Sequence, residues 1–198
     1  WQKQAHELLP VPMYYTYMRL YRDKLLIAPI QVKGKKGPDF MIVLGENSQW
    51  NKLRIVYNDP ASIRLPYPRE IEFIGSMNQL AIAPDFGTEV FLFDIYSGRA
   101  ERLIESPTLD GKMRWVEELD RLFIAFPNRM EIWVINPHTK TVDWKIPTQP
   151  GVRSLAIDVK RGVIVNASVL TGQILVQHMR TGEVLDRFGT VMPMVREL

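Results

Sequence analysis

Cysteine is absent from the 198 residues of this chain. Disulfide bonds, thiolate nucleophiles and cysteine-ligated metals are therefore excluded. Long apolar runs are missing too: 25–30 is among the longest, far short of the ~18 residues that a membrane helix needs. Outside the first ten residues, no stretch keeps a helical period. The fold must therefore be built mainly from strands, without covalent cross-links.

Motifs of catalysis are also missing. The sequence contains no Gly-x-Ser-x-Gly elbow, no Walker loop, no Gly-x-Gly-x-x-Gly and no His-x-x-x-His spacing. The three histidines are far apart in sequence: His6, His138 and His178. Four carboxylates lie in or beside expected turns: Asp59, Asp85, Asp94 and Asp120. Such residues usually shape the backbone of the turn, so we expect no catalytic, metal-binding or cofactor-binding residue.

Neither sign of charge dominates, because the formal net charge is only +3. The one dense basic cluster is Lys33-Gly34-Lys35-Lys36-Gly37. Its glycine spacing favours a solvated hairpin loop, and the alternative is a site for phosphate or an anionic lipid. A nucleic-acid binder usually concentrates basic residues on one face, so we expect no nucleic-acid partner.

A repeat with a period of 42 residues is the main feature that the chain does contain. The turn-like segment Asp94–Gly98 recurs as Asn136–Lys140 and as His178–Gly182. Each copy follows an apolar run: Val90–Phe93, Ile132–Ile135 and Ile174–Val176. A period of roughly 40–50 residues made of short strands is typical of a β-propeller with one four-stranded sheet per repeat. The predicted fold class is therefore an all-β propeller.

About four four-stranded antiparallel blades fit the length of the chain. The expected bounds are a lead-in at 1–16, blades at 17–58, 62–106, 113–147 and 152–190, and the start of a further blade at 195–198. A propeller ring closes by returning its last strand to the first blade or by continuing through more blades. The first repeat already has an inner strand near Met18–Leu20, so we expect continuation into a larger ring.

The order of apolar strand, Asp or Asn turn, Thr-Gly and outer strand resembles the YVTN-type and quinoprotein-like β-propellers. Phe93–Arg99 and Gln177–Glu183 carry the resemblance best. The Tyr-Val-Thr-Asn tetrapeptide itself is absent, and so is the Trp-Asp signature of WD40 repeats after the third strands. The resemblance implies a propeller, often extracytoplasmic, that is used for binding or assembly rather than for one fixed chemistry.

One segment is similar to the tryptophan-docking motif of quinoproteins. It is Val134–Trp144, with Trp144 at the motif's tryptophan position, whereas the flanking repeats have Arg102 and Asp186 there. In those proteins the motifs staple neighbouring blades, and some of the rings hold a quinone. A single tryptophan on an outer strand favours packing between blades over a cofactor site.

Arginines recur at the expected starts of inner strands: Arg69, Arg114, Arg153 and Arg196, with Arg19 as a candidate fifth. Inner strands surround the channel of a propeller, so these side chains could form an anion-attracting mouth that receives an acidic ligand or partner side chain. The alternative is that each arginine pairs with a carboxylate of a neighbouring blade.

The leading hypothesis is a non-enzymatic module for protein–protein interaction or complex assembly, extracytoplasmic and in the bacterial envelope. The alternatives are a quinoprotein-like or lactonase-like enzyme with its active site in blades outside this chain, and a surface-layer or adhesion module. Membrane contact is expected only through an anchor upstream of Trp1.

Asn166-Ala167-Ser168 fits a glycosylation acceptor, but it follows an expected buried strand and we attribute it to chance.

Overall fold

The computed structural model describes residues 13–21, 24–32, 41–45, 53–65, 68–84, 87–105 and 112–189, with side chains from Val56 onward. The basic cluster at 33–37, Arg196 and the expected further blade at 195–198 lie outside these residues. Contacts divide the chain into two compact units. Unit 1 comprises 1–73, 78–86 and 91–102, and unit 2 comprises 74–77, 87–90 and 103–198.

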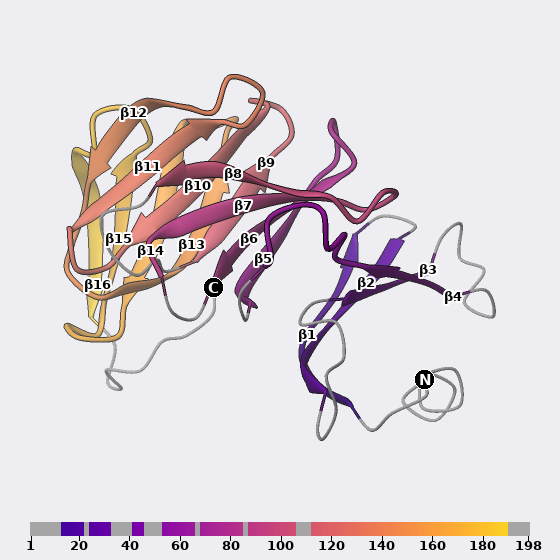
Figure 1. Ribbon diagram of the computed structural model, residues 1–198. Helices are drawn as coiled ribbons and strands as arrows, with labels where there is room; N and C mark the ends of the chain where they lie inside the picture. Colours follow the sequence, from indigo (N-terminus) through magenta and orange to yellow (C-terminus); the bar gives the residue numbers. More distant parts are fainter. Residues whose placement is uncertain are drawn as a thin grey trace. The chain divides into compact units, whose positions relative to one another are not determined.

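Within the described residues all regular structure is β, arranged in four sheets of four strands (Figure 1). The first sheet contains β1 (Met13–Tyr21), β2 (Lys24–Val32), β3 (Met41–Gly45) and β4 (Leu53–Tyr57). The second contains β5 (Pro68–Ile74), β6 (Gln79–Pro84), β7 (Glu89–Asp94) and β8 (Ala100–Glu105). The third contains β9 (Met113–Val116), β10 (Arg121–Phe126), β11 (Glu131–Asn136) and β12 (Thr141–Pro147). The fourth contains β13 (Val152–Asp158), β14 (Val163–Ser168), β15 (Gln173–His178) and β16 (Val184–Gly189).

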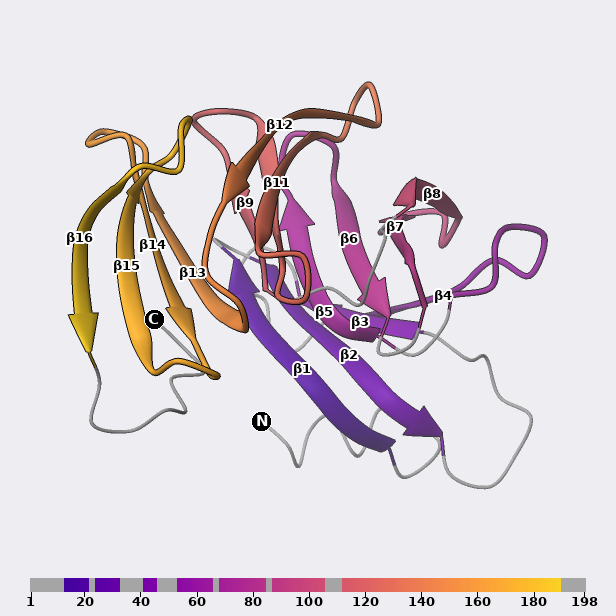
Figure 2. The same cartoon turned by 90° about the vertical axis from the view of Figure 1, so that its left-hand side faces the viewer.

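Each sheet is a meander whose strands lie side by side in chain order (Figure 2). The pairings are antiparallel, as in β10 with β11 and β14 with β15. The predicted four-stranded antiparallel blades are thereby confirmed. The first strand, β1, begins at Met13, inside the segment expected as a lead-in.

The 42-residue period is visible in the backbone dihedral angles as well as in the strands. The first turn of each later sheet has positive φ at one matching position: Asn78 (53°), Asp120 (53°) and Gly162 (68°). The third turn has it at Gly98 (74°), Lys140 (57°) and Gly182 (76°). Glycine adopts this conformation without steric cost, and Asn and Asp tolerate it. A lysine does not, so the backbone of Lys140 is strained.

The third turn of each of these sheets is held by the residue that precedes it. Asp94 Oδ1 accepts hydrogen bonds from the backbone N–H groups of Tyr96 (2.9 Å) and Ser97 (2.7 Å). Asn136 Oδ1 and His178 Nδ1 accept equivalent backbone bonds of 3.0 and 3.2 Å. These three residues are therefore turn formers, as the sequence predicted.

Apolar side chains from facing strands form the core of each unit. In unit 1 the core includes Ile71, Leu80 and Phe93. In unit 2, Phe123 and Val134 of the third sheet pack with Leu155 and Ile164 of the fourth. No helix among the described residues is long and apolar enough to cross a membrane.

Candidate functional site

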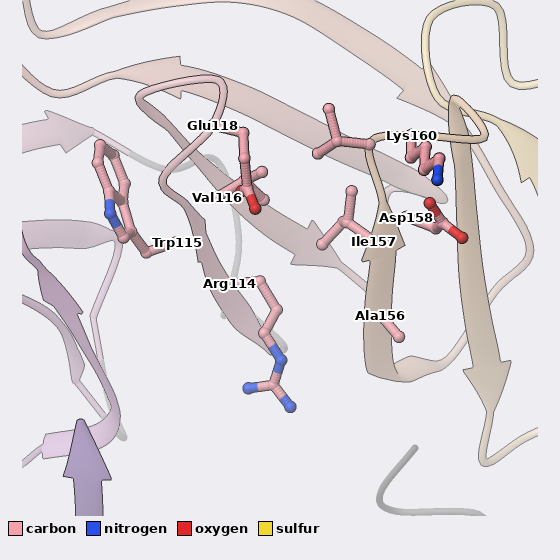
Figure 3. A pocket seen from close by; sticks show the side chains of 9 residues that line it. Arg114, Trp115, Val116, Glu118, Ala156, Ile157, Asp158 and Lys160 are labelled. Carbon is pink, nitrogen blue, oxygen red and sulfur yellow. The ribbon is translucent and has the colours of Figure 1, made fainter. Parts of the chain in front are cut away.

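A cleft of about 730 Å³ lies in unit 2 between the first strands of the third and fourth sheets, β9 and β13. Its lining continues into the turns that follow those strands, 117–120 and 159–162. Figure 3 shows the Arg114 side chain extending from β9 on the side of β13, whereas Trp115 projects in another direction. Val116 and Ile157 supply apolar lining, so the cleft combines the positive charge of Arg114 with hydrophobic side chains.

The two strands that border the cleft are edge strands. β9 ends the order β12-β11-β10-β9, and β13 begins the order β13-β14-β15-β16. One side of each strand therefore has no partner within its own sheet. The unpaired N–H and C=O groups of such an edge can bond to an added extended chain.

The charges around the cleft are mixed, but one of the acids is already neutralised. Arg114 and Lys160 are basic, and Glu118 and Asp158 are acidic. A guanidinium nitrogen of Arg161 lies 2.6 Å from Asp158 Oδ2. This hydrogen bond lowers the pKa of Asp158, so the Asp158 carboxylate stays ionised and paired.

Arg114 is half-buried, and its polar contact within the described residues is weak. Its guanidinium donates one hydrogen bond of 3.3 Å, to the carbonyl oxygen of Met113. Within the described part of the chain it has no carboxylate partner. The charge of Arg114 is therefore left available for an incoming anion.

The described residues place one of the four predicted arginines, Arg114, in the cleft. Arg69 belongs to unit 1, and Arg196 lies outside the described residues. Arg153 follows Val152 at an irregularity in the pairing of β13 with β14, and it does not line the cleft. Arg114 is the member of the predicted set that the cleft contains, and the idea of a shared arginine mouth stays a prediction.

Arg114 and Arg153 stand near the starts of β9 and β13, as the sequence predicted, but in different registers. Arg114 pairs with Phe123, and the matching pair one period later is Ala156 with Val165. Arg114 therefore corresponds in register to Ala156 and not to Arg153, because register is set by the ladder of strand pairs.

Trp144 joins the third sheet to the fourth. Its indole Nε1 donates a hydrogen bond of 3.1 Å to the carbonyl oxygen of Met179, in the turn between β15 and β16. The guanidinium of Arg180 lies 4.0 Å from the Trp144 ring centroid, and Phe123 meets the ring edge-to-face. The tryptophan thus packs between sheets, as the sequence favoured.

A buried amide network lies inside the fourth sheet and was not foreseen. Asn166 Nδ2 donates to Gln177 Oε1 at 2.7 Å, and Gln149 Nε2 donates to Asn166 Oδ1 at 3.0 Å. Asn166 has no exposed surface, so its amide is unavailable for glycosylation in the folded chain. The sequence contains a signal for this network. Asn166 and Gln177 replace isoleucines of the preceding repeat, Ile124 and Ile135, which stand 42 residues earlier.

Metal-binding geometry is not found in the described ranges, where no three His, Asp or Glu side chains gather as ligands. No protein-family profile matches the chain, and no curated protein matches it.

Solved structures do match the chain, at low identity. The WD40 β-propeller domain of Doa1 has a TM-score of 0.65 and 9% identity, covering 91% of this chain and 55% of that one. A chain of a nidogen/laminin complex has a TM-score of 0.63 and 10% identity, covering 85% and 60%. The computationally designed Ika8 protein has a TM-score of 0.58 and 12% identity, covering 89% and 62%.

The chain has the β-propeller fold. It spans 55–62% of the length of these similar structures. At such identities the likeness concerns the fold alone, because one fold supports many unrelated functions.

Proposed function

We propose that this propeller is a non-enzymatic protein-interaction module that takes an acidic, extended peptide segment of a partner into the cleft between β9 and β13. The observation that carries the proposal is the position of Arg114, half-buried in the cleft and without a carboxylate partner among the described residues. A charge-assisted hydrogen bond from a guanidinium to a carboxylate is about twice as strong as a neutral one.

The surroundings of Arg114 favour an extended peptide over a free small anion. Strands β9 and β13 present open backbone edges, which pair with an added strand. Val116 and Ile157 offer apolar contact for alternate side chains of such a strand. A partner segment with one acidic and one aliphatic side chain on the same face would satisfy both features.

Binding of a labelled peptide tests the proposal. The probe is a blocked peptide with Glu and Val two residues apart, so that both side chains lie on one face of an extended strand. It is compared with the same peptide carrying Gln in place of Glu, by fluorescence anisotropy at two salt concentrations. Arg114→Gln should weaken binding of the Glu peptide about 10-fold and flatten its salt dependence, since one charged hydrogen bond is worth about 1.5–3 kcal/mol.

Two matched controls make the same charge change elsewhere. Arg153→Gln alters an arginine that does not line the cleft, and Arg187→Gln alters an exposed arginine on β16. Both should bind the Glu peptide like the unmodified protein. If all three variants bind equally well, or if the Gln peptide binds as tightly as the Glu peptide, the cleft is not an acidic-segment site.

The bacterial envelope is the compartment we propose for this module, as a subunit of a larger assembly. The support is the resemblance of the repeat to YVTN-type and quinoprotein-like propellers, which are often extracytoplasmic. Fractionation of cells that express the intact protein would test the location. Recovery of the protein from the cytoplasm would contradict it.

The inter-sheet packing of Trp144 supports the quinoprotein-like side of that resemblance, since the docking motif has this role there. The packing of Trp144 is therefore a reason to test the second candidate function, a quinoprotein-like enzyme. Because that alternative places the active site in blades outside this chain, calorimetric titration of the intact protein with calcium and a quinone cofactor distinguishes the two functions. Cofactor binding would favour the enzyme, whereas its absence together with peptide binding would favour the interaction module.

A further inference from the structure

The two walls of the cleft are equivalent segments of successive repeats. Arg114 corresponds in register to Ala156, and the same 42-residue offset relates Glu118 to Lys160. All four residues line the cleft, and the strands β9 and β13 that bear its walls contact each other within unit 2. The cleft can therefore be compared position by position. At one end an arginine is matched with an alanine, and at the other end Glu118 is matched with Lys160.

Lys160 is the second basic residue of the cleft lining. It belongs to the turn after β13, whereas Arg114 extends from β9 (Figure 3), and its side chain is exposed. Within the described part of the chain no carboxylate forms a salt bridge with its ammonium group. Asp158, at the end of β13, is already paired with Arg161 at 2.6 Å. The charge of Lys160 is therefore available to a bound anion, like that of Arg114.

The positions of the two cations along the repeat set the spacing of the acids that they can bind. Arg114 matches Ala156, and Lys160 stands four residues after Ala156. A strand advances about 3.3 Å per residue, so four residues correspond to at most about 13 Å. In an extended peptide, side chains four residues apart are separated by the same distance and lie on the same face.

Apolar residues of the lining occupy the middle of this interval. Val116 stands two residues after Arg114 and two before Glu118, and Ile157 follows Ala156. A peptide residue midway between two acids lies on their face of the extended chain. An aliphatic side chain at that place would meet Val116 and Ile157.

We propose that Lys160 is a second anchor of the cleft, so that the partner segment carries two acidic residues four positions apart with an aliphatic residue midway. This inference rests on the proposed function, because it takes the cleft to be a site for an acidic peptide, and it adds the spacing of the acids. Arg114, which is half-buried, provides most of the affinity. The exposed Lys160 provides the preference for a second acid, because exposed ion pairs are weak.

Glu118 acts against a second acid at this end of the cleft. It is exposed, lines the cleft and occupies the position of Lys160 one repeat earlier. The balance of charge still favours an acid, because Arg161 neutralises Asp158. Arg114 and Lys160 then remain against Glu118 alone, which leaves an excess of positive charge in the cleft.

Three labelled peptides of equal length test the spacing by fluorescence anisotropy at low salt. The spaced peptide has two glutamates four residues apart with valine midway. The adjacent peptide has the same composition, with its second glutamate moved next to the first, and the single-acid peptide has glutamine in place of the second glutamate. The spaced peptide should bind about 3-fold more tightly than either of the others, as expected for one exposed ion pair. Equal binding of the spaced and adjacent peptides would overturn the proposal.

Lys160→Gln should remove this 3-fold gain and leave binding of the single-acid peptide unchanged. Arg187→Gln removes the same charge from an exposed residue of β16 and should keep the full gain. Glu118→Gln should tighten binding of the spaced peptide, since it removes a carboxylate from the same end of the cleft. All three residues are exposed, so circular dichroism should show the variants folded. An equal loss for the single-acid and spaced peptides in Lys160→Gln would contradict a second anchor.

A fourth peptide, with lysine in place of the second glutamate, separates Lys160 from Glu118. It should bind the unmodified protein more weakly than the spaced peptide does, and it should bind Lys160→Glu more tightly than the spaced peptide does. The reverse order on the unmodified protein would assign the position to Glu118 and overturn the proposal.

The single-acid peptide separates this inference from the proposed function. If it binds Arg114→Gln as tightly as the unmodified protein, the proposed function fails and the second anchor fails with it. If Arg114→Gln weakens its binding but the spaced peptide shows no gain, the second anchor alone is wrong.

Discussion

The side chains of Asn166 and Gln177 form a hydrogen bond of 2.7 Å between adjacent strands β14 and β15, and both are almost fully buried. Gln177 Nε2 also donates to the carbonyl oxygens of Pro147 (2.9 Å) and Gly182 (2.7 Å). The pair therefore ties the segment that leaves β12 to the middle of the fourth sheet. A satisfied polar network of this kind fixes one arrangement of the two sheets, because slipped arrangements would leave amides unpaired.

Asn166→Ala should destabilise the protein by about 2–4 kcal/mol. The substitution removes two buried hydrogen bonds, from Asn166 to Gln177 Oε1 and from Gln149 Nε2 to Asn166, each worth about 0.5–1.5 kcal/mol. It also leaves a small cavity, which adds to the loss. Urea unfolding followed by tryptophan fluorescence measures the loss. Asn128→Ala, at an exposed turn residue, should stay within about 0.5 kcal/mol of the unmodified protein. Equal effects of the two changes would mean that the network contributes no stability.

Trp144→Phe should cost about 1–2 kcal/mol. Phenylalanine keeps an aromatic ring but loses the hydrogen bond from Nε1 to Met179, and its contact with the Arg180 guanidinium is weaker. Arg180→Gln removes the cation alone and should cost about 0.5–1 kcal/mol. The double variant should lose less than the sum, since the two residues share one contact. Strict additivity in thermal unfolding would show that the two groups are not coupled.

The 42-residue repeat was sufficient to predict the four-stranded blades and the turn residues, and the similarity to a docking motif predicted the packing of Trp144. The blades and turns depend on local periodicity and on side chains that act within one or two turns, so a single sequence displays them. Asp94, Asn136 and His178 illustrate this, because each bonds the backbone two or three residues ahead.

The cleft and the amide network could not be predicted in the same way. Both depend on register, and a shift of three residues separates Arg153 from the position that matches Arg114. Hydrogen-bond partners such as Gln149 and Asn166 come from a connecting segment and a strand, and only packing brings them together.

Lys140→Gly should stabilise the protein by about 1 kcal/mol. Lys140 has a φ of 57°, at the position where the neighbouring repeats have Gly98 and Gly182. A side chain in the left-handed region costs about 1–2 kcal/mol, partly offset because glycine has more freedom in the unfolded chain. Thermal unfolding by calorimetry should show a higher Tm. A lower Tm would mean that the contacts of the lysine outweigh the strain of its backbone.

Gly98→Ala is the opposite change at the matching position. A Cβ atom there would lie 2.0 Å from the carbonyl oxygen of Tyr57, and the φ of 74° disfavours any side chain. Destabilisation of more than about 1 kcal/mol is expected. If alanine is tolerated at this position, the turn is not as constrained as its dihedral angles indicate.

The stability contributed by Glu131 should depend on pH. Trp133 Nε1 donates a hydrogen bond of 2.7 Å to Glu131 Oε2. This bond is the main cause that lowers the pKa of Glu131 below its ordinary value of 4.5, with help from Lys145 and Arg129. A carboxylate with a lowered folded-state pKa stabilises the protein above the unfolded-state value, and the contribution is lost as the pH falls through the folded-state value.

Glu131→Gln therefore should cost stability at pH 7 and much less below the folded-state pKa. The loss at pH 7 should be small, about 0.5–1 kcal/mol, because the carboxylate is partly exposed and the amide oxygen still accepts from Trp133. Urea unfolding of both proteins at a series of pH values from 7 downward measures the difference. Glu183→Gln, at an exposed residue before β16, controls for the change in net charge. A loss for Glu131→Gln that does not shrink as the pH falls would show that the ionised form has no preferential interaction in the folded protein.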